Sequence, residues 1–282
     1  MCLFVSTAQR ANAVDANPRD YVPAPVGTHS ALFYYYYGNH RSYVNQNGND
    51  VPDSELISNV MVARYVEYFE YKGMVMNWNV VQVFGGFNSA KVGDADLSHN
   101  GFQLGDTALV YTLYPVNKPE KEMYVAIANH LILPTGSHDS DTDLNLGGNR
   151  WSVTVQPGFY ISLFGKWSAE LLGDISIYGD NTDGPGGATV KEDPSFTAIT
   201  WLNYATPSPG SNAAVGVTAT KYGDKTIGGV AQDGRYSIAI RAAYTHMLNP
   251  TTQLVMEVSH DLAVKNTFEK DIGVLLRFSK AL

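Results

Sequence analysis

The sequence predicts an all-β protein, a transmembrane antiparallel up-and-down β-barrel of about twelve strands. Three observations predict this fold: apolar and polar residues alternate, short and long connections alternate, and the composition is poor in charge but rich in aromatic residues. The alternation is clearest over residues 151–163. The odd-numbered positions from Trp151 to Leu163 are apolar, whereas the even-numbered ones, apart from Tyr160, are small or polar. A period of two indicates a β-strand, because successive side chains point to opposite faces.

The composition separates this chain from soluble proteins and from helical membrane proteins. Of its 282 residues, 16% are charged and 12% are aromatic, with 18 tyrosines; soluble domains have about 25% charged residues. The longest apolar run, Tyr124 to Leu133, contains Asn129 and His130 and is shorter than the roughly 18 residues of a spanning helix. A barrel fits both facts, because only half of each strand meets lipid. A soluble β-sandwich is the alternative, with its apolar faces packed on each other.

The charge and the cysteine content exclude further classes. The net charge is −8, and no basic stripe is present, so nucleic acid is not an expected partner. Cys2 is the single cysteine, which rules out an internal disulfide. A closed, hydrogen-bonded barrel would supply stability without one.

The start of the chain predicts three segments. Residues 1–13 resemble the remnant of a signal peptide, since Ala11-Asn12-Ala13 fits the small-x-small cleavage rule; a plain disordered N-terminus is the alternative. Residues 14–27 are expected to form a periplasmic N-terminal leader, stiffened by prolines, and a partial plug in the lumen is the other role considered. Residues 28–282 are expected to form the outer-membrane β-barrel.

The strand pattern recurs along the whole chain. We expect twelve strands, near 29–44, 55–71, 74–86, 106–115, 121–133, 150–164, 167–179, 194–206, 212–223, 234–247, 251–263 and 267–279. Most have the length that a tilted strand needs to cross a bilayer. The connections between them are short and long in turn, except the last, and this alternation is typical of outer-membrane barrels, with brief periplasmic turns and longer outer loops.

Aromatic residues on the apolar face predict two girdles, one at each membrane interface. One group begins strands and comprises Trp151, Tyr236 and Phe268. The other lies at the opposite strand ends and comprises Trp167, Tyr244 and Phe278. Lys270 is an exception on the same face, near a strand end where it could snorkel.

Charged residues fall on the polar face of the later strands, and we expect this face to line the lumen. The candidates are Glu170, Asp174, Arg241, Glu257, Asp261, Asp271 and Arg277. A charge facing lipid at the midplane costs roughly 2–4 kcal/mol for Arg or Lys. Two roles stay open: the charges crosslink a narrow lumen, or they form a selectivity ring. Arg64 and Glu67 fall on opposite faces of one strand, which suggests a bulge or a displaced register there.

Several stretches together resemble a known family. Asp20 to Thr28 precedes the first strand, Gly105-Asp106 opens the fourth, Leu133 to Gly136 follows the fifth, Leu144 to Trp151 leads into the sixth, and Glu192-Asp193-Pro194 precedes the eighth. Their order and spacing resemble the outer-membrane family named for the meta-pathway of phenol degradation. Its members are described as transporters of aromatic or hydrophobic compounds. The resemblance implies a barrel and passage of small organic molecules, and it brings no ligand or catalytic residues.

Two loop motifs resemble sites that bind calcium or hydrolyse lipid. Asp139, Asp141 and Asp143 alternate as in a calcium loop, but Leu144 and Arg150 stand where glycine and glutamate are needed. We therefore expect a solvated loop, no metal and no cofactor. Ser98-His99 faintly resembles the site of an outer-membrane phospholipase. A serine hydrolase, however, needs a base within hydrogen-bond reach of the serine and a third group that orients the base, and two adjacent residues in a loop do not establish this arrangement.

The sequence thus predicts a channel of the bacterial outer membrane for passive uptake of small organic compounds, aromatic or hydrophobic ones among them, and not an enzyme. Its expected partners are outer-membrane lipid, the small organic solute and the outer-membrane assembly machinery. Two alternatives are an outer-membrane lipid hydrolase and a structural or adhesive barrel with a closed lumen.

Overall fold

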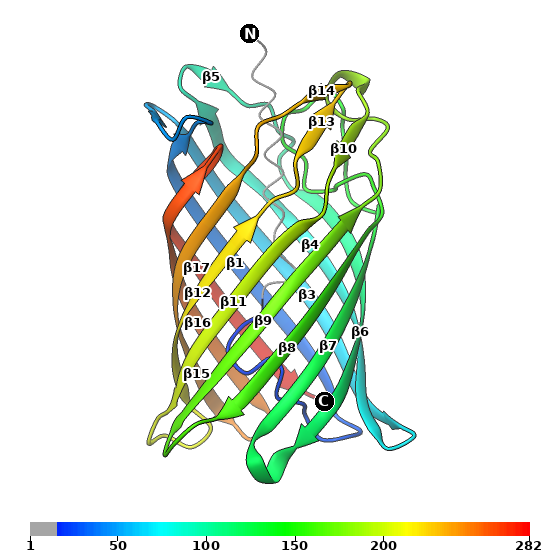
Figure 1. Cartoon of the computed structure of the whole chain (residues 1–282), viewed down its shortest axis with the longest axis vertical. Helices are drawn as coiled ribbons and strands as arrows, with labels where there is room; N and C mark the ends of the chain where they lie inside the picture. Colours follow the sequence, from blue (N-terminus) through cyan, green and yellow to red (C-terminus); the bar gives the residue numbers. More distant parts are fainter. Residues whose placement is uncertain (1–15) are drawn as a thin grey trace.

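The computed structural model describes residues 16–282, and they form a closed antiparallel barrel of 12 strands (Figure 1). The strands are β1 (His29–Val44), β3 (Glu55–Tyr71), β4 (Met74–Val92), β6 (Gln103–Lys118), β7 (Met123–Leu133), β8 (Ser152–Ser162), β9 (Trp167–Tyr178), β11 (Ser195–Ala205), β12 (Asn212–Lys221), β15 (Tyr236–Asn249), β16 (Thr252–Lys265) and β17 (Thr267–Ala281). The fold class, the strand count and the approximate positions predicted from the sequence are confirmed.

Each long strand pairs with its neighbours in the chain, and the first strand closes the barrel against the last. In that closing pair, Phe33 of β1 lies opposite Phe278 of β17. Closure gives every strand two hydrogen-bonded neighbours, so no sheet edge is left to face lipid. The residues predicted as a signal-peptide remnant, 1–13, lie outside the described part of the chain.

The two ends of the barrel differ in the length of their connections (Figure 1). One end carries tight turns such as Tyr71 to Met74, and the backbone N–H of Leu282 bonds to the His29 carbonyl there. The other end carries long loops with short strands: β2 (Asp50–Val51), β5 (Ala95–Asp96), β10 (Val190–Glu192), β13 (Lys225–Ile227) and β14 (Val230–Ala231). Two 3-10 turns, η1 (Pro119–Lys121) and η2 (Pro185–Gly187), complete the elements.

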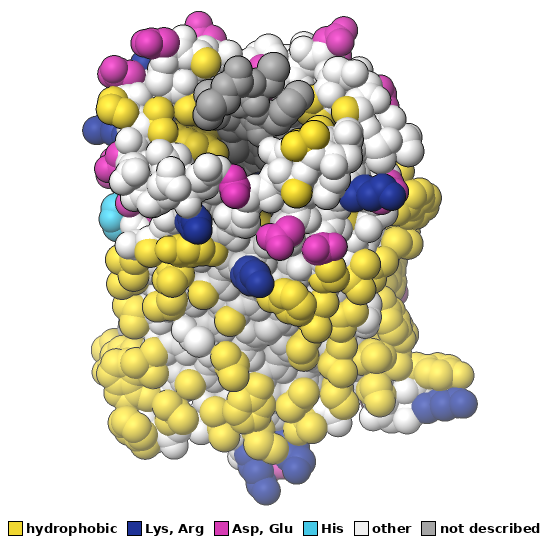
Figure 2. Space-filling model, turned by 45° about the horizontal axis from the view of Figure 1, so that its top comes forward, with side chains coloured by type: hydrophobic (Ala, Val, Ile, Leu, Met, Phe, Trp, Pro, Cys, Tyr) yellow, Lys and Arg dark blue, Asp and Glu magenta, His cyan; other side chains and the backbone are white. Residues whose placement is uncertain are grey.

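The alternation of each strand separates a lipid-facing surface from an inner face. Leu171 is 57% exposed, whereas its neighbour Leu172 is 1% exposed and lies among the inward-facing residues. Figure 2 shows hydrophobic side chains gathered over the barrel wall below the loops. Of the predicted girdle residues, Trp151, Tyr236 and Phe278 are exposed on this wall, and the Trp167 ring lies 4.9 Å from the Tyr204 ring. No helix among residues 16–282 is long and apolar enough to cross a membrane.

A bulge in β17 corrects the prediction for Phe268. The register with β1 runs from Asn39 opposite Ile272 to His40 opposite Lys270, so Asp271 is skipped. A skipped residue reverses the alternation of every residue beyond it. Phe268 is therefore 1% exposed and packs against Tyr43, inside the barrel and not in a girdle. Lys270 likewise does not snorkel toward lipid, since its ammonium lies 3.7 Å from the Asp261 carboxylate.

Candidate functional site

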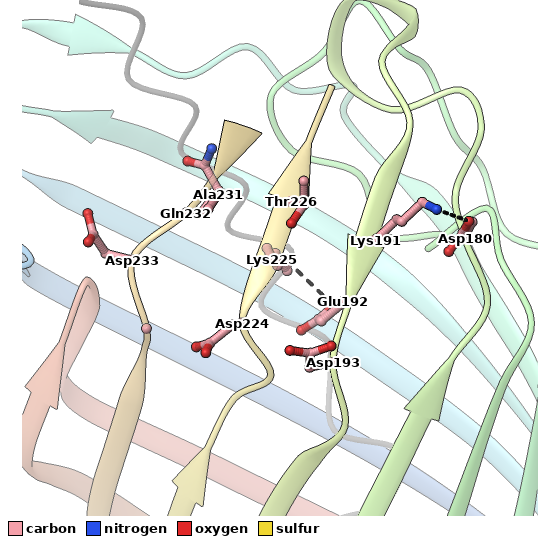
Figure 3. A pocket seen from close by; sticks show the side chains of 11 residues that line it. Asp180, Lys191, Glu192, Asp193, Asp224, Lys225, Thr226, Ala231, Gln232 and Asp233 are labelled. Atoms are coloured by element: carbon pink, nitrogen blue, oxygen red, sulfur yellow. Dashed lines mark ion pairs between the residues drawn. The ribbon is translucent and has the colours of Figure 1, made fainter. Parts of the chain in front are cut away.

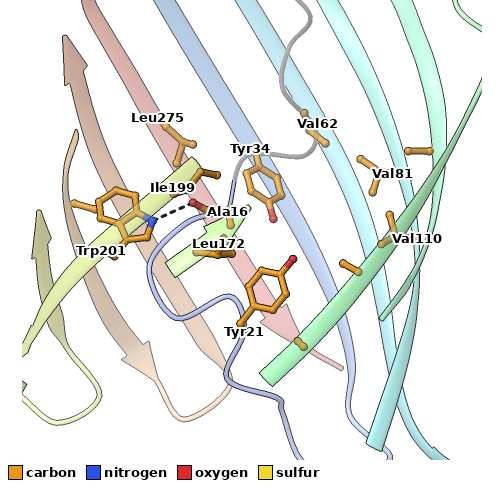
Figure 4. Packing of buried hydrophobic residues seen from close by; sticks show 14 of the residues in the cluster. Ala16, Tyr21, Tyr34, Val62, Val81, Val110, Leu172, Ile199, Trp201 and Leu275 are labelled. Carbon is orange, nitrogen blue, oxygen red and sulfur yellow. Dashed lines mark hydrogen bonds between the residues drawn. The ribbon is translucent and has the colours of Figure 1, made fainter. Parts of the chain in front are cut away.

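The lumen contains a stretch of the chain that precedes the first strand. Residues 16–22, which we call the inner segment, run inside the barrel (Figure 4). Asn17 is fully buried, Tyr21 is 5% exposed, and the indole N–H of Trp201 in β11 donates to the Ala16 carbonyl. From the sequence, residues 14–27 are expected to be a periplasmic leader, with a partial plug as the other role. The structure places residues 16–22 of this range among lumen side chains.

Arg241 and Glu257 form a buried ion pair beside the inner segment. Arg241 donates from Nε to Glu257 Oε1 at 2.7 Å and from Nη2 to Oε2 at 2.9 Å. The guanidinium also lies 4.7 Å from the ring centre of Trp201. Asn17 donates its side-chain amide to Glu257 at 3.0 Å. Bidentate geometry and a further donor compensate the cost of burying these charges.

Arg277 of the neighbouring strand β17 also holds the inner segment. Its Nη1 donates to Asp20 at 2.5 Å and to the Asn17 side chain at 3.3 Å, while Nη2 donates to Gln253 at 2.9 Å. The buried guanidinium therefore joins β17, β16 and the inner segment.

Two carboxylates on β9 complete the attachment. Glu170 accepts from the Arg19 backbone N–H and from the Asn203 amide, each at 2.8 Å. Asp174 accepts from Gln156 at 2.6 Å, and the Tyr21 hydroxyl donates to the same Gln156 side chain. Glu170 thus bonds both to the barrel wall and to the inner segment, and Asp174 is linked to the inner segment through Gln156.

The remaining two candidates lie toward the loop end. Asp261 is 6% exposed and accepts from the Lys270 backbone N–H at 2.8 Å. Asp271 differs from the rest, because the bulge turns it outward. Its side chain is 51% exposed and lies 3.9 Å from that of Arg41, which is 71% exposed. Asp271 therefore does not line the lumen.

A part of the lumen that sequence reasoning did not single out is apolar. The apolar wall consists of small, buried, inward-facing side chains from β3, β4, β6 and β7: Val60, Val62, Val81, Val83, Ala108, Val110, Ala126 and Ala128. The charged residues named above come from β9, β15, β16 and β17 instead, whereas the polar side chains beside the apolar wall include Arg64 and Asn79.

Arg64 is a lumen residue that the sequence analysis left unassigned. It donates to Asn79 at 2.6 Å, Asn79 donates to Asn77, and Asn77 donates to the Tyr114 hydroxyl. The bulge expected in this strand is absent: β3 pairs with β4 without interruption from Arg64 to Glu67, and the register shift between the two strands skips Asn88 of β4. Glu67 lies on the opposite face, 3.9 Å from His29. Arg64 could have been found, because it shares the parity of the buried residues Val60, Val62 and Val66.

One carboxylate anchors the loop that joins β7 to β8. Asp106 accepts backbone N–H bonds from Gly136 at 2.9 Å and from Gly148 at 2.8 Å. A side chain on Gly136 would lie 2.7 Å from both the Gly105 carbonyl carbon and the Gly147 Cα. Three of the stretches on which the family resemblance rests therefore meet at this carboxylate: Gly105-Asp106, Leu133 to Gly136, and Leu144 to Trp151.

A buried ion cluster joins the other loops. Glu192 contacts Arg150, lies 3.2 Å from Arg235 and 3.8 Å from Lys225, and is itself 4% exposed in its side chain. The strands β10, β13 and β14 pair around it. A cavity of about 480 Å³ beside the cluster is lined by acidic residues that include Asp180, Asp193, Asp224 and Asp233 (Figure 3). The cluster ties loop residues far apart in sequence into one outer structure.

The two loop motifs form local contacts. A backbone N–H from Asp141 and the Asn100 amide lower the pKa of the Asp139 carboxyl, and Asp143 accepts from the Ser98 hydroxyl at 2.7 Å. Within residues 16–282, no group of three His, Cys, Asp or Glu side chains could hold a metal ion.

A serine and a histidine do meet elsewhere in the barrel. Ser211 lies 2.8 Å from His246 Nδ1, beside a short turn and far from the outer loops. No carboxylate of the described chain bonds to this histidine, so the third group of a hydrolytic triad is not provided there.

Fold and lumen together define an outer-membrane β-barrel channel, with an apolar exterior, a partly filled interior and outer loops. The family model "Putative MetA-pathway of phenol degradation" matches residues 40–278, and the chain belongs to this family. The protein is therefore one of the bacterial outer membrane.

Solved structures agree with this assignment. The chain is similar to the COG4313 outer membrane channel from Pseudomonas putida F1, with 29% identity, a TM-score of 0.88, and 95% of this chain and 100% of that chain covered. It shares the fold of the deltaS2S3 mutant of TodX, a monoaromatic hydrocarbon channel, with 9% identity, a TM-score of 0.54, and coverage of 95% and 93%. No curated protein matches the sequence.

Proposed function

We propose that this protein is a channel for passive entry of small hydrophobic or aromatic compounds across the outer membrane. The observation that carries the proposal is the apolar wall, a set of buried valines and alanines that runs over four neighbouring strands inside the barrel. A lumen for hydrophilic solutes has no need of such a surface, because it offers water and sugars no hydrogen-bond partners. The similarity to channel structures supports the same function.

The inner segment would regulate or restrict passage. It is held by side chains from β8, β9, β16 and β17 through hydrogen bonds and ion pairs. Such contacts can exchange with water one at a time, so the segment can shift without unfolding the barrel. Movement of the solute would follow its gradient and would use no cofactor.

A catalytic role is not part of the proposal. The Ser98 hydroxyl bonds to Asp143, and the His99 ring packs against Phe87. The lipid hydrolase considered from the sequence would need a serine and its base joined at the outer rim.

The test is uptake by proteoliposomes that contain the purified protein. We expect faster entry of naphthalene and toluene than into protein-free liposomes, together with small ion conductance in planar bilayers. Heat-modifiable migration in gels would confirm that the barrel is folded. Folded protein that neither conducts ions nor accelerates uptake would contradict the proposal and favour a closed structural barrel.

A further inference from the structure

His130 stands out on the inner face of β7 because it is buried and unsatisfied. It shares the inward-facing side of the strand with Ala126 and Ala128, and it is 7% exposed. Among residues 16–282, neither ring nitrogen of His130 has a hydrogen-bond partner. A buried polar group without a partner destabilises a protein. An unsatisfied imidazole at the lumen is therefore expected to have a function, such as binding a ligand that supplies the missing hydrogen bond.

The cross-strand neighbours of His130 do not bond to it. Val110 of β6 and Thr154 of β8 lie directly across from it in the sheet. Val110 belongs to the apolar wall, and the Thr154 hydroxyl bonds to Ser176 at 2.7 Å. Along β7, the next inward-facing positions are Ala128 and Ile132. The imidazole therefore has apolar neighbours on β6 and β7, the Thr154 hydroxyl on β8, and the positive charge of Arg64 near enough to act on it, but it has no hydrogen-bond partner among the described residues.

The position of His130 relative to the inner segment is also informative. Ala128 lies across from Gln156, the residue that bonds to Tyr21 of the inner segment. His130 is two residues further along β7, toward the long loops. A solute that enters from the loop end would therefore meet His130 before it meets the inner segment.

We propose that His130 and the adjacent part of the apolar wall form a binding subsite for a neutral, hydroxyl-bearing apolar solute, such as a phenol. This inference rests on the proposed channel function and names the solute class. A neutral imidazole offers one donor and one acceptor nitrogen, which matches a hydroxyl group. The rest of the solute would contact valine and alanine. Taking a charged solute out of water is costly, and the positive charge of Arg64, which acts on the imidazole, would repel a cation.

The test compares two probes that differ by one hydroxyl, 2-naphthol and naphthalene. Binding is measured by equilibrium dialysis against the full protein in lipid nanodiscs, with empty nanodiscs as the blank. We expect the protein to bind 2-naphthol about threefold to tenfold more tightly than naphthalene, the range for one net hydrogen bond. His130→Phe should abolish this preference and leave naphthalene binding intact, whereas His130→Asn should retain part of it.

A matched control is available on the outer face. His260 of β16 is exposed, and its Nδ1 lies 2.7 Å from the Asp271 carbonyl. His260→Phe makes the same chemical change away from the lumen and should leave the preference unchanged. His130→Leu provides a second apolar variant if His130→Phe does not reach the folded, heat-modifiable form.

The possible failures are distinct. Binding of naphthalene without a preference for 2-naphthol overturns the subsite while the channel function stands. A preference that survives in both apolar His130 variants also overturns it. If neither probe binds the folded protein or enters proteoliposomes, the channel function and the subsite fail together.

Discussion

Asp20 and Arg277 are 257 residues apart in the chain, yet Arg277 Nη1 lies 2.5 Å from the Asp20 carboxylate inside the barrel. The pair joins the segment before the first strand to the strand that closes the barrel. The inner segment is therefore attached to the same wall whose pairing completes the fold.

Replacing Asp20 should loosen the inner segment. In Asp20→Ala, Arg277 keeps its bond to Gln253, but the segment loses its ion pair. We expect higher single-channel conductance in planar bilayers with the barrel still folded, and a smaller rise in Asp20→Asn, which keeps an acceptor. Asp50→Ala, in an exposed loop, is the control. Conductance equal to that of the unchanged protein would show that Asp20 does not hold the segment.

Removing one member of the Arg241 and Glu257 pair should destabilise the barrel. Arg241→Ala leaves the Glu257 carboxylate buried with only the Asn17 amide bonded to it, and loss of one partner of a buried pair costs about 3–5 kcal/mol. The free energy of unfolding can be measured by urea titration in detergent.

The matched variant removes both charges at once. Arg241→Met combined with Glu257→Leu should recover most of that loss, because no uncompensated charge remains. A double variant as unstable as Arg241→Ala would mean that the pair contributes through packing instead.

Asp106 should control the order of the loop that joins β7 and β8. Asp106→Ala deprives the part-buried Gly136 and Gly148 backbone N–H groups of their acceptor, at a cost below the roughly 1–3 kcal/mol of a fully buried unpaired donor. We expect faster hydrogen exchange at these two amides and unchanged exchange in β7. Asp106→Asn keeps the shape and one oxygen, so its effect should be intermediate. Equal protection in all three proteins would rule out this anchoring role.

Glu192 should hold the outer loops together. Glu192→Ala leaves Arg150, Lys225 and Arg235 close to one another without the carboxylate between them, and like charges repel. Limited proteolysis should then cut the loops around β10 and β13 sooner than in the unchanged protein. Lys191→Ala, which removes an exposed ion pair with Asp180, should have little effect, since exposed pairs contribute little. Identical cleavage rates for Glu192→Ala and the parent would contradict the role.

The sequence by itself determined the barrel and its strands. Strand alternation is a local property, since successive side chains point to opposite faces whatever the rest of the chain does. Residues 151–163 therefore predicted a strand correctly, and the short and long connections predicted the two ends. The same alternation placed Glu170, Asp174, Arg241, Glu257, Asp261 and Arg277 on one face, where the structure has them buried.

Only the tertiary structure decided what those residues contact. The bulge at Asp271 depends on the register between β17 and β1, so a pattern read along one strand put Phe268 and Asp271 on the wrong faces. The inner segment carries no periodicity, and its place follows from polar groups such as Asn17 and Asp20 meeting charges more than 200 residues away. The unsatisfied imidazole of His130 became visible only once β6 and β8 supplied its neighbours. Contacts between distant residues are set by closure of the barrel, and no local pattern encodes them.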